Sequence, residues 1–339
     1  MRSFLVSPQA LGGLALACLA GVGFCPGYAH AYVRSYTVEG CHPVFWAQTC
    51  VHITTDSDGV PEMSLADVEN TVKTSINSWQ SMIGGSSFMK LSYLPANSKR
   101  ETVATDKLQV VKFRSVTWGR PATEKAAAVT YDAAAAAITT VTYINKPMDA
   151  VADGRIIDAD IELNAVNNYF YNADGAAPTS GQRKPTDLWN TLTHEIGHLM
   201  GLEHTCKRSG DNMPACTRDG NGNTVISCGV VEAGRVANPA YQSIYDTTMY
   251  PTADPKETKK RQPKADDVSG VLNTYPSAMD PKICTVPDVY GMTQATGGCS
   301  ASGSVRDQQS AVPAAMASLG ALATLTLLWA RRRRRFASR

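Results

Sequence analysis

The stretch "HEIGHLMGLEH", residues 194–204, concentrates three of the chain's six histidines and one glutamate in a short segment. On a helix, His194 and His198 lie one turn apart on the same face, about 6 Å apart along the axis. This spacing lets both imidazoles reach one tetrahedral zinc ion at roughly 2.0–2.1 Å. Glu195 lies beside the first ligand and leans over the open side of the metal, where it can accept a proton from a zinc-bound water.

Gly201 follows the two histidines at the point where the helix is expected to end. A third ligand ten residues after the first cannot share the same helical face, so the chain must turn sharply. Glycine reaches the left-handed conformation that ends helices without a Cβ penalty, and His204 is thereby brought back as the third ligand. An amphipathic helix with incidental histidines is the alternative, but the full H-E-x-x-H-x-x-G-x-x-H spacing is far more specific than H-E-x-x-H alone. The segment predicts a catalytic zinc site.

Both ends of the chain have the composition of targeting segments. Residues 1–31 combine a charged start, an apolar run and the sequence Ala29-His30-Ala31, which is typical of a cleaved signal peptide. A transmembrane anchor is the alternative, which the short, glycine-rich run disfavours. Residues 311–330 carry no charge and are long enough to cross a bilayer, and five arginines follow at 331–335. Because positive residues stay on the cytoplasmic side, the chain between the two segments is expected to face outward.

The charge of that outward part is slightly acidic. The whole chain has a formal net charge of +2, but seven of its arginines lie in the two terminal segments. Without them, 25 basic residues stand against 30 acidic ones. This balance gives no reason to expect nucleic acid as a partner.

Cysteine usage agrees with export. Outside the signal peptide, six cysteines fall within or just after the folded region and can form three bridges in an oxidising compartment. They are Cys41, Cys50, Cys206, Cys216, Cys228 and Cys284. Proximity favours Cys41–Cys50 as one pair, and the connectivity of the others stays open. Cys299 is left over.

Hydrophobic periodicity predicts an α+β domain. A helix is expected at 64–83, where Ser64 can cap it and apolar residues recur every three or four positions. Further helices are expected at about 186–200 and 265–275. Alternation predicts strands around 51–53, 108–113, 138–144 and 156–163, the first of them followed by a turn at 56–59. The alanine-rich stretch 133–137 is of low complexity, and we assign it no function.

The zinc motif and a second segment together resemble the metzincin metalloproteases. "DTTMYPTAD" at 246–254 is similar to the methionine-bearing turn beneath the metal of that clan, with Met249 as the methionine. The resemblance covers roughly residues 40–276. It implies a catalytic domain with a twisted mixed sheet, an active-site helix, a Met-turn and a C-terminal helix. It also implies that Met249 shapes the floor of the site and that Tyr250 assists.

Several features are similar to the matrixin branch of the clan. Thr205 follows the third histidine, "MYP" at 249–251 resembles the matrixin turn, and "KADDVSGVLNTYP" at 264–276 resembles its closing helix. "DADIELN" at 158–164 resembles the edge strand along which a substrate peptide lies extended. A pappalysin-like branch is the alternative, since "EHT" occurs there too.

The chain also departs from the matrixin pattern. Only His42 and His52 stand outside the motif in the mature part, so we expect one zinc ion and no second, structural one. No propeptide cysteine has room before the domain, and "CTVPDV" at 284–289 echoes that switch segment on the wrong side, so Cys284 is interpreted as a disulfide partner. The stretch 205–246 is expected to be a disulfide-stapled insertion near the cleft. Within it, residues 219–223 space like a calcium loop but are interpreted as a tight turn. Calcium elsewhere is implied only by family analogy.

The C-terminal segment resembles sorting tags of the MYXO-CTERM type. "TGGCSASGS" at 296–304 precedes a polar linker, one hydrophobic span and an arginine cluster. The resemblance implies envelope sorting machinery as a partner and Cys299 as the point of processing and attachment. An ordinary single-pass anchor is the alternative.

Together these features predict an exported zinc endopeptidase, at the cell surface or outside the cell, that acts on proteins or peptides. The competing hypothesis is a non-catalytic surface binding or adhesion protein built on a protease-like domain, against which the intact Glu195 argues. The expected organisation is a signal peptide at 1–31, a catalytic domain at 32–282, a linker with Cys299 at 283–310, a transmembrane segment at 311–330 and a basic cytoplasmic tail at 331–339.

Overall fold

The computed structural model describes residues 31–96, 103, 107–124, 127–175 and 181–285. All of them belong to the first of two compact units, which comprises Met1–Gly297. The expected signal peptide up to position 30, Cys299, the hydrophobic segment 311–330 and the basic tail lie outside the described residues. Within the described part, no helix is both long and apolar enough to cross a membrane.

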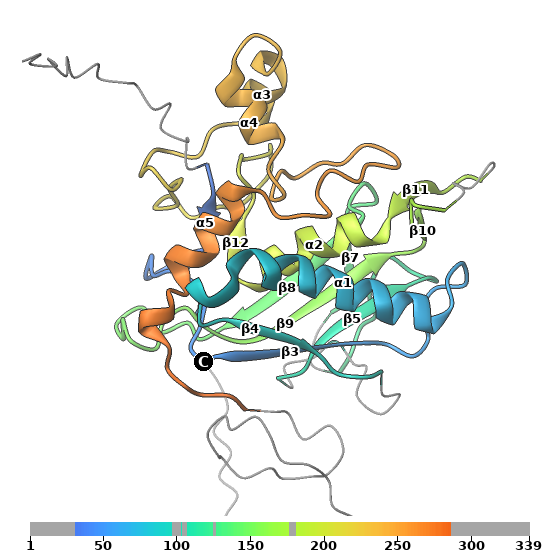
Figure 1. Ribbon diagram of the computed structural model, residues 1–339, viewed down its shortest axis with the longest axis horizontal. Helices are drawn as coiled ribbons and strands as arrows, with labels where there is room; N and C mark the ends of the chain where they lie inside the picture. Colours follow the sequence, from blue (N-terminus) through green and yellow to red (C-terminus); the bar gives the residue numbers. More distant parts are fainter. Residues whose placement is uncertain (1–30, 97–102, 104–106, 125–126, 176–180, 286–339) are drawn as a thin grey trace, which may run out of the picture. The chain divides into compact units, whose positions relative to one another are not determined.

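A six-stranded, mostly parallel sheet forms one layer of the domain (Figure 1). Strands run in the order β2-β9-β5-β3-β4 with parallel pairing, and β8 pairs antiparallel with β9. Their bounds are β2 (Phe45–Trp46), β3 (Cys50–Thr55), β4 (Lys90–Tyr93), β5 (Gln109–Arg114), β8 (Ala137–Tyr143) and β9 (Arg155–Asn164). The structure thus confirms all four predicted strands within a metzincin-type α+β fold.

Strand β8 is an edge of this sheet, and the assignment of the edge strand to residues 158–164 is wrong. Those residues belong to β9, which has β5 on one side and β8 on the other. The alternation of acidic and apolar residues in "DADIELN" suggests a half-exposed strand, yet its carboxylates are buried and accept hydrogen bonds from neighbouring segments. Asp160 accepts a hydrogen bond from the Val110 N–H at 3.0 Å, and Glu162 accepts one from Arg114 at 2.7 Å.

Two helices cover the same face of the sheet (Figure 1). Helix α1 (Leu65–Ile83) is capped by the Ser64 hydroxyl, which accepts the Asp67 N–H at 3.1 Å, as predicted. Helix α2 (Leu188–Leu199) is capped by Asp187, which accepts the Asn190 N–H at 2.7 Å. The core lies between the helices and the sheet, and its buried residues include Val51, Ile53, Val68, Val72, Ile76, Trp79, Val111, Ile161, Leu163, Leu188, Leu192 and Ile196.

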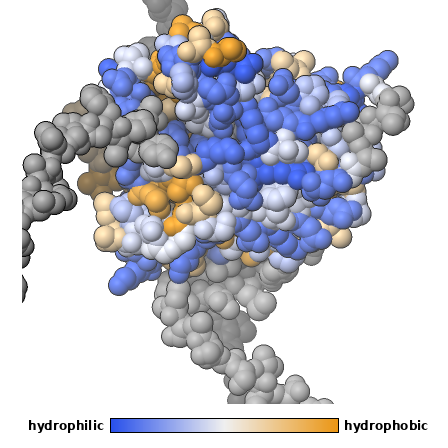
Figure 2. Space-filling view, turned by 45° about the horizontal axis from the view of Figure 1, so that its top comes forward, coloured by the Kyte–Doolittle hydropathy of each residue, from blue (hydrophilic) through white to orange (hydrophobic). Residues whose placement is uncertain are grey.

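Shorter elements surround these layers. The third predicted helix is α5 (Ala265–Thr274). Three strand pairs are β1 (Val33–Arg34) with β12 (Leu202–Glu203), β6 (Gly119–Arg120) with β7 (Val129–Thr130), and β10 (Asn168–Tyr171) with β11 (Lys184–Asp187). The remaining elements are α3 (Cys228–Gly234), α4 (Pro239–Tyr245) and 3₁₀ turns at Gly84–Ser86 and Ser277–Met279. Helices α3 and α4 project at the top of Figure 1. The face drawn in Figure 2 is largely hydrophilic, with one hydrophobic patch at its top and another at its lower left.

Three disulfides join the six cysteines, but the pairing differs from the proximity argument. The bridges are Cys41–Cys216, Cys50–Cys284 and Cys206–Cys228, so the predicted Cys41–Cys50 pair is wrong. Cys50 starts strand β3, which lies between β5 and β4, whereas Cys41 lies in the turn before β2, and their partners are 234 and 175 residues further along the chain. Closeness along the chain did not decide the pairing, since each cysteine pairs with a partner that is distant in the sequence. Cys284 is confirmed as a disulfide partner.

Two of these bridges fasten the insertion 205–246. Cys206–Cys228 closes it internally, and Cys41–Cys216 ties it to the N-terminal part of the domain. Residues 219–223 form the predicted tight turn, since the Asp219 carboxylate accepts the N–H groups of Asn221 and Asn223 at 3.0 and 2.8 Å. Gly222 has a φ of +82°, as such a turn requires.

Candidate metal centre and active-site cleft

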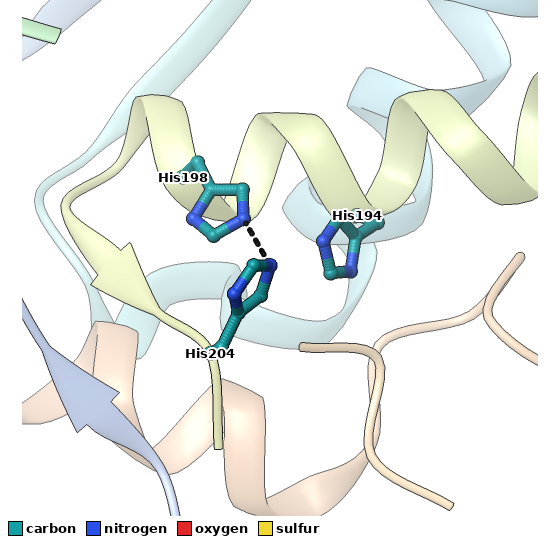
Figure 3. Close-up of side chains that lie close together, drawn as sticks. All are labelled: His194, His198 and His204. Carbon is teal, nitrogen blue, oxygen red and sulfur yellow. Dashed lines mark hydrogen bonds between the residues drawn. The ribbon is translucent and has the colours of Figure 1, made fainter. Parts of the chain in front are cut away.

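The three motif histidines converge on one point (Figure 3). His194 and His198 project from α2, and His204 comes from the segment after β12. One nitrogen from each ring lies within 4.8 Å of the others, and the Nε2 atoms of His198 and His204 are 3.2 Å apart. Tetrahedral ligands at about 2.1 Å from a zinc ion lie about 3.4 Å from one another. The three side chains therefore fit a zinc ion, with a fourth position left for water.

The turn at Gly201 brings His204 to this point. Gly201 has a φ of +84°, and a Cβ atom there would meet the Val44 carbonyl oxygen at 2.7 Å. Its N–H donates to the His198 carbonyl at 2.8 Å, which closes the helix. The next residues form β12 and pair with β1, so the direction of the chain after the turn is fixed. The predicted role of Gly201 is confirmed.

Backbone carbonyls orient two of the imidazoles. The Nδ1–H of His194 donates to the Thr248 carbonyl at 2.6 Å, and that of His198 donates to the Leu202 carbonyl at 2.9 Å. Each bond leaves Nε2 without a proton and pointing to the metal position. Burial lowers the pKa values of His194 and His204 well below the ordinary histidine range, so their rings are neutral at pH 7. Neutral imidazole is the form that binds a metal ion.

Glu195 is buried beside the triad and is held by the edge strand. Its Oε2 accepts a hydrogen bond from the Thr139 hydroxyl at 2.6 Å, and only 5% of the residue is exposed. Burial raises the pKa of this carboxyl above its ordinary value, which makes it a stronger base once ionised. Thr139 belongs to β8, and sequence reasoning missed it because no motif marks a threonine within "ITTVTY".

Met249 lies directly beneath α2. A Cβ atom on Gly197 would meet the Met249 sulfur at 2.2 Å, so only glycine at 197 allows this approach. The turn that carries Met249 is fixed by α5, because the Asp267 carboxylate accepts the N–H groups of Thr248 and Met249 at 2.7 and 3.1 Å. This is the arrangement expected of a methionine-bearing turn beneath the metal.

Tyr250 has a different role from the expected one. Its hydroxyl donates to Glu232 at 2.9 Å, and its ring packs with Cys206, Cys228 and Val231 in a second hydrophobic cluster. It is fully buried there and does not line the cleft. Tyr250 therefore anchors the insertion to the Met-turn, and the expectation that it assists the reaction is wrong.

A cleft of about 700 Å³ runs past the histidines. Its walls come from β8 and the preceding alanines, from α2, from the insertion and from the segment after the Met-turn. Ala134–Ala137, in the stretch to which we assigned no function, line one wall, and Arg208 and Asp211–Pro214 of the insertion contribute to another. The insertion thus lies at the cleft, as predicted.

The two histidines outside the motif lie apart from the triad. His42 Nδ1 is 2.9 Å from the Asp153 carboxylate, and His52 Nδ1 is 2.6 Å from the Ser92 hydroxyl. Among the described residues, the motif histidines are the group placed to hold a metal ion.

Comparison with known families agrees with this site. Residues 158–251 match the model of the M12B metallo-peptidase family, reprolysin-like, and this segment contains all three histidines, Glu195 and Met249. No curated protein matches the chain. The fold, the triad and the matched segment support a zinc-dependent metallopeptidase domain of the metzincin type. The reprolysin-like match points to a branch of the clan other than the matrixins.

Proposed function

We propose that this chain is an exported zinc-dependent endopeptidase in which Glu195 acts as general base. The observation that carries the proposal is the position of Glu195, which is buried next to a ligand histidine and held by Thr139 without being part of the triad. A carboxylate there has no packing role that a neutral side chain could not fill. Its desolvation is costly, and it is retained where a proton must be moved.

The chain's own residues divide the reaction between them. His194, His198 and His204 would hold the metal ion, which when bound supplies Lewis-acid activation of water and of the scissile carbonyl. Glu195 accepts a proton from the attacking water and then delivers it to the leaving amine. The Thr139 hydroxyl keeps the carboxylate turned toward the cleft during both transfers.

The free edge of β8 supports a peptide as the substrate. In the described part of the chain, no strand pairs with the side of β8 that faces the cleft. An extended peptide can add to such an edge through backbone hydrogen bonds, which recognise any sequence, while side-chain pockets select among sequences. Because Thr139 lies on this strand, a peptide bound there passes directly by Glu195.

Within the metzincins, a matrixin-like branch is our proposal on the sequence features quoted above. Asp267 supports it, because the segment that resembles the matrixin closing helix is also the segment that holds the Met-turn. The reprolysin-like match favours another branch, and a pappalysin-like one is a third.

The competing function is a surface binding or adhesion protein on a protease-like domain. The test is digestion of a peptide library by the mature protein, with Glu195→Gln and a zinc chelator as parallel arms. We expect cleavage by the wild type, loss of about 10²–10⁴-fold in the variant at unchanged zinc content, and recovery of chelated wild type on adding zinc. Library peptides left intact by zinc-loaded wild type would favour the binding protein.

Export and attachment are proposals from the terminal sequences. We propose that residues 1–31 direct export, and that the C-terminal segment is a sorting tag cut near Cys299 by envelope sorting machinery. A permanent single-pass anchor through residues 311–330 is the alternative. Peptide mapping of the mature cell-surface form separates them, because a peptide recovered from Ser300 onward rules out the tag.

A further inference from the structure

The cleft extends from the histidines toward the start of α2, where its lining becomes strongly polar. Asn190 lies one turn before His194 on α2. Its Oδ1 accepts a hydrogen bond from the backbone N–H of Lys260 at 2.7 Å. Lys184 Nζ donates to the Ala253 carbonyl at 2.7 Å, which ties the segment after the Met-turn to β11. Six residues that line this part of the cleft are called the polar recess here: Thr186, Asn190, Thr191, Thr252, Glu257 and Lys260.

Lys260 brings a buried positive charge to the recess. The residue is 2% exposed, and its ammonium donates to the carbonyls of Tyr250 and Thr252, the latter at 2.8 Å. Burial lowers the pKa of Lys260 to about 8, so it remains largely protonated at neutral pH. Among the described residues, no carboxylate pairs directly with it. An ammonium has three N–H groups, and these two carbonyls use only two of them.

Glu257 contributes a buried acceptor atom, Oε1, that has no hydrogen-bond donor. Its side chain is 10% exposed, and its Oε2 lies 3.6 Å from Lys259 Nζ and 3.3 Å from the Asp254 N–H. Its Oε1 is buried without any hydrogen-bond partner. A buried carboxylate oxygen left unpaired costs more than an ordinary hydrogen bond contributes, so this atom favours a ligand that donates to it.

We propose that the polar recess binds a substrate side chain that ends in a carboxamide, so that the peptidase selects glutamine or asparagine at that position. The carboxamide oxygen would accept from Lys260, and its NH₂ group would donate to Glu257 Oε1. A carboxylate side chain meets Glu257, a basic side chain meets Lys260, and an aliphatic one leaves both groups unpaired. This inference rests on the proposed peptidase function and names the substrate class of the same site.

The test begins with the zinc-loaded mature protein and a peptide library, which locates the selective position. Matched peptides then carry Gln, Asn, Glu, Lys or Leu there. We expect kcat/KM for Gln or Asn to exceed that for the others by about tenfold or more, because hydrogen bonds to charged groups are among the stronger ones. In the Glu257→Gln variant, kcat/KM for the Glu peptide relative to the Gln peptide should rise about tenfold. In the Lys260→Met variant, kcat/KM for the Gln peptide should no longer exceed that for the Leu peptide.

Lys256→Met is the matched control, because Lys256 is exposed on the same segment and lies outside the recess lining. Its kcat/KM values across the matched peptides should equal those of the wild type. If Lys260→Met fails to fold, Glu257→Gln decides alone, since it keeps the shape and changes one acceptor. A wild-type preference for Leu, or a profile that neither variant changes, overturns the inference. If zinc-loaded wild type cleaves no peptide at all, the proposed function fails instead.

Discussion

Gly197 offers a direct test of how closely the Met-turn packs against the active-site helix. It lies between Glu195 and His198, where glycine is a poor helix former, yet a Cβ atom would meet Met249 Sδ at 2.2 Å and Trp79 Cζ2 at 3.3 Å. Overpacking of this kind costs about 1–3 kcal/mol, whereas the gain in helix propensity from Gly to Ala is about 1 kcal/mol. Met249 is fully buried, so it cannot move aside into solvent. We expect Gly197→Ala to destabilise the protein by up to about 2 kcal/mol.

The measurement is urea unfolding of the zinc-loaded protein followed by tryptophan fluorescence. Gly229→Ala in α3 is the matched control, because its Cβ would meet only Ser227 Oγ at 3.6 Å. We expect it to be neutral or to stabilise by up to about 1 kcal/mol. A double variant Gly197→Ala with Met249→Ala should cost less than the two single changes added together. Equal stabilities of Gly197→Ala and Gly229→Ala would refute the packing argument.

Three further predictions concern the chemistry and the cross-links. Because the Thr139 hydroxyl lowers the pKa of Glu195, its removal should raise that pKa and shift the acid limb of kcat/KM. Thr139→Val should move this limb to higher pH while Thr139→Ser restores it, which a pH profile measures. Elemental analysis should give one zinc ion per chain, and two would contradict the ligand count. Replacing Cys50 and Cys284 together by serine should lower the free energy of unfolding by about 2–5 kcal/mol, and an unchanged urea midpoint would count against the bridge.

Local periodicity was enough to predict the three longest helices and four of the six strands of the main sheet. The apolar residues from Val68 to Ile83 recur on one face of α1, and this face is buried. Ser64 caps the start of the same helix through a bond to Asp67, three residues further on. The triad was predictable for the same reason, because a helix fixes the distance between His194 and His198 without reference to the rest of the fold. Gly201 was the third local signal, since its left-handed conformation follows from the need to turn.

Relations between distant segments were not predictable in this way. The partner of Cys50 is 234 residues away, so no local pattern encodes it. The edge strand was misplaced because "DADIELN" has the alternation of an exposed strand. Only its hydrogen bonds to the neighbouring strand β5 show that its carboxylates are buried. Tyr250 follows the Met-turn methionine in sequence, but its side chain packs in the second hydrophobic cluster, with Cys206, Cys228 and Val231.

The groups that sequence reasoning missed are those that connect the motif to its surroundings. Thr139 reaches Glu195 only because β8 pairs antiparallel with β9 and so lies along α2. Lys260 lines the cleft from the segment between the Met-turn and α5, where its ammonium donates to the Tyr250 carbonyl next to the turn that Asp267 holds. The metal ligands can therefore be recognised from one short motif, whereas the threonine that holds the base and the lysine of the recess come from segments that carry no motif. Selectivity among peptides should accordingly vary with those segments while the triad stays unchanged.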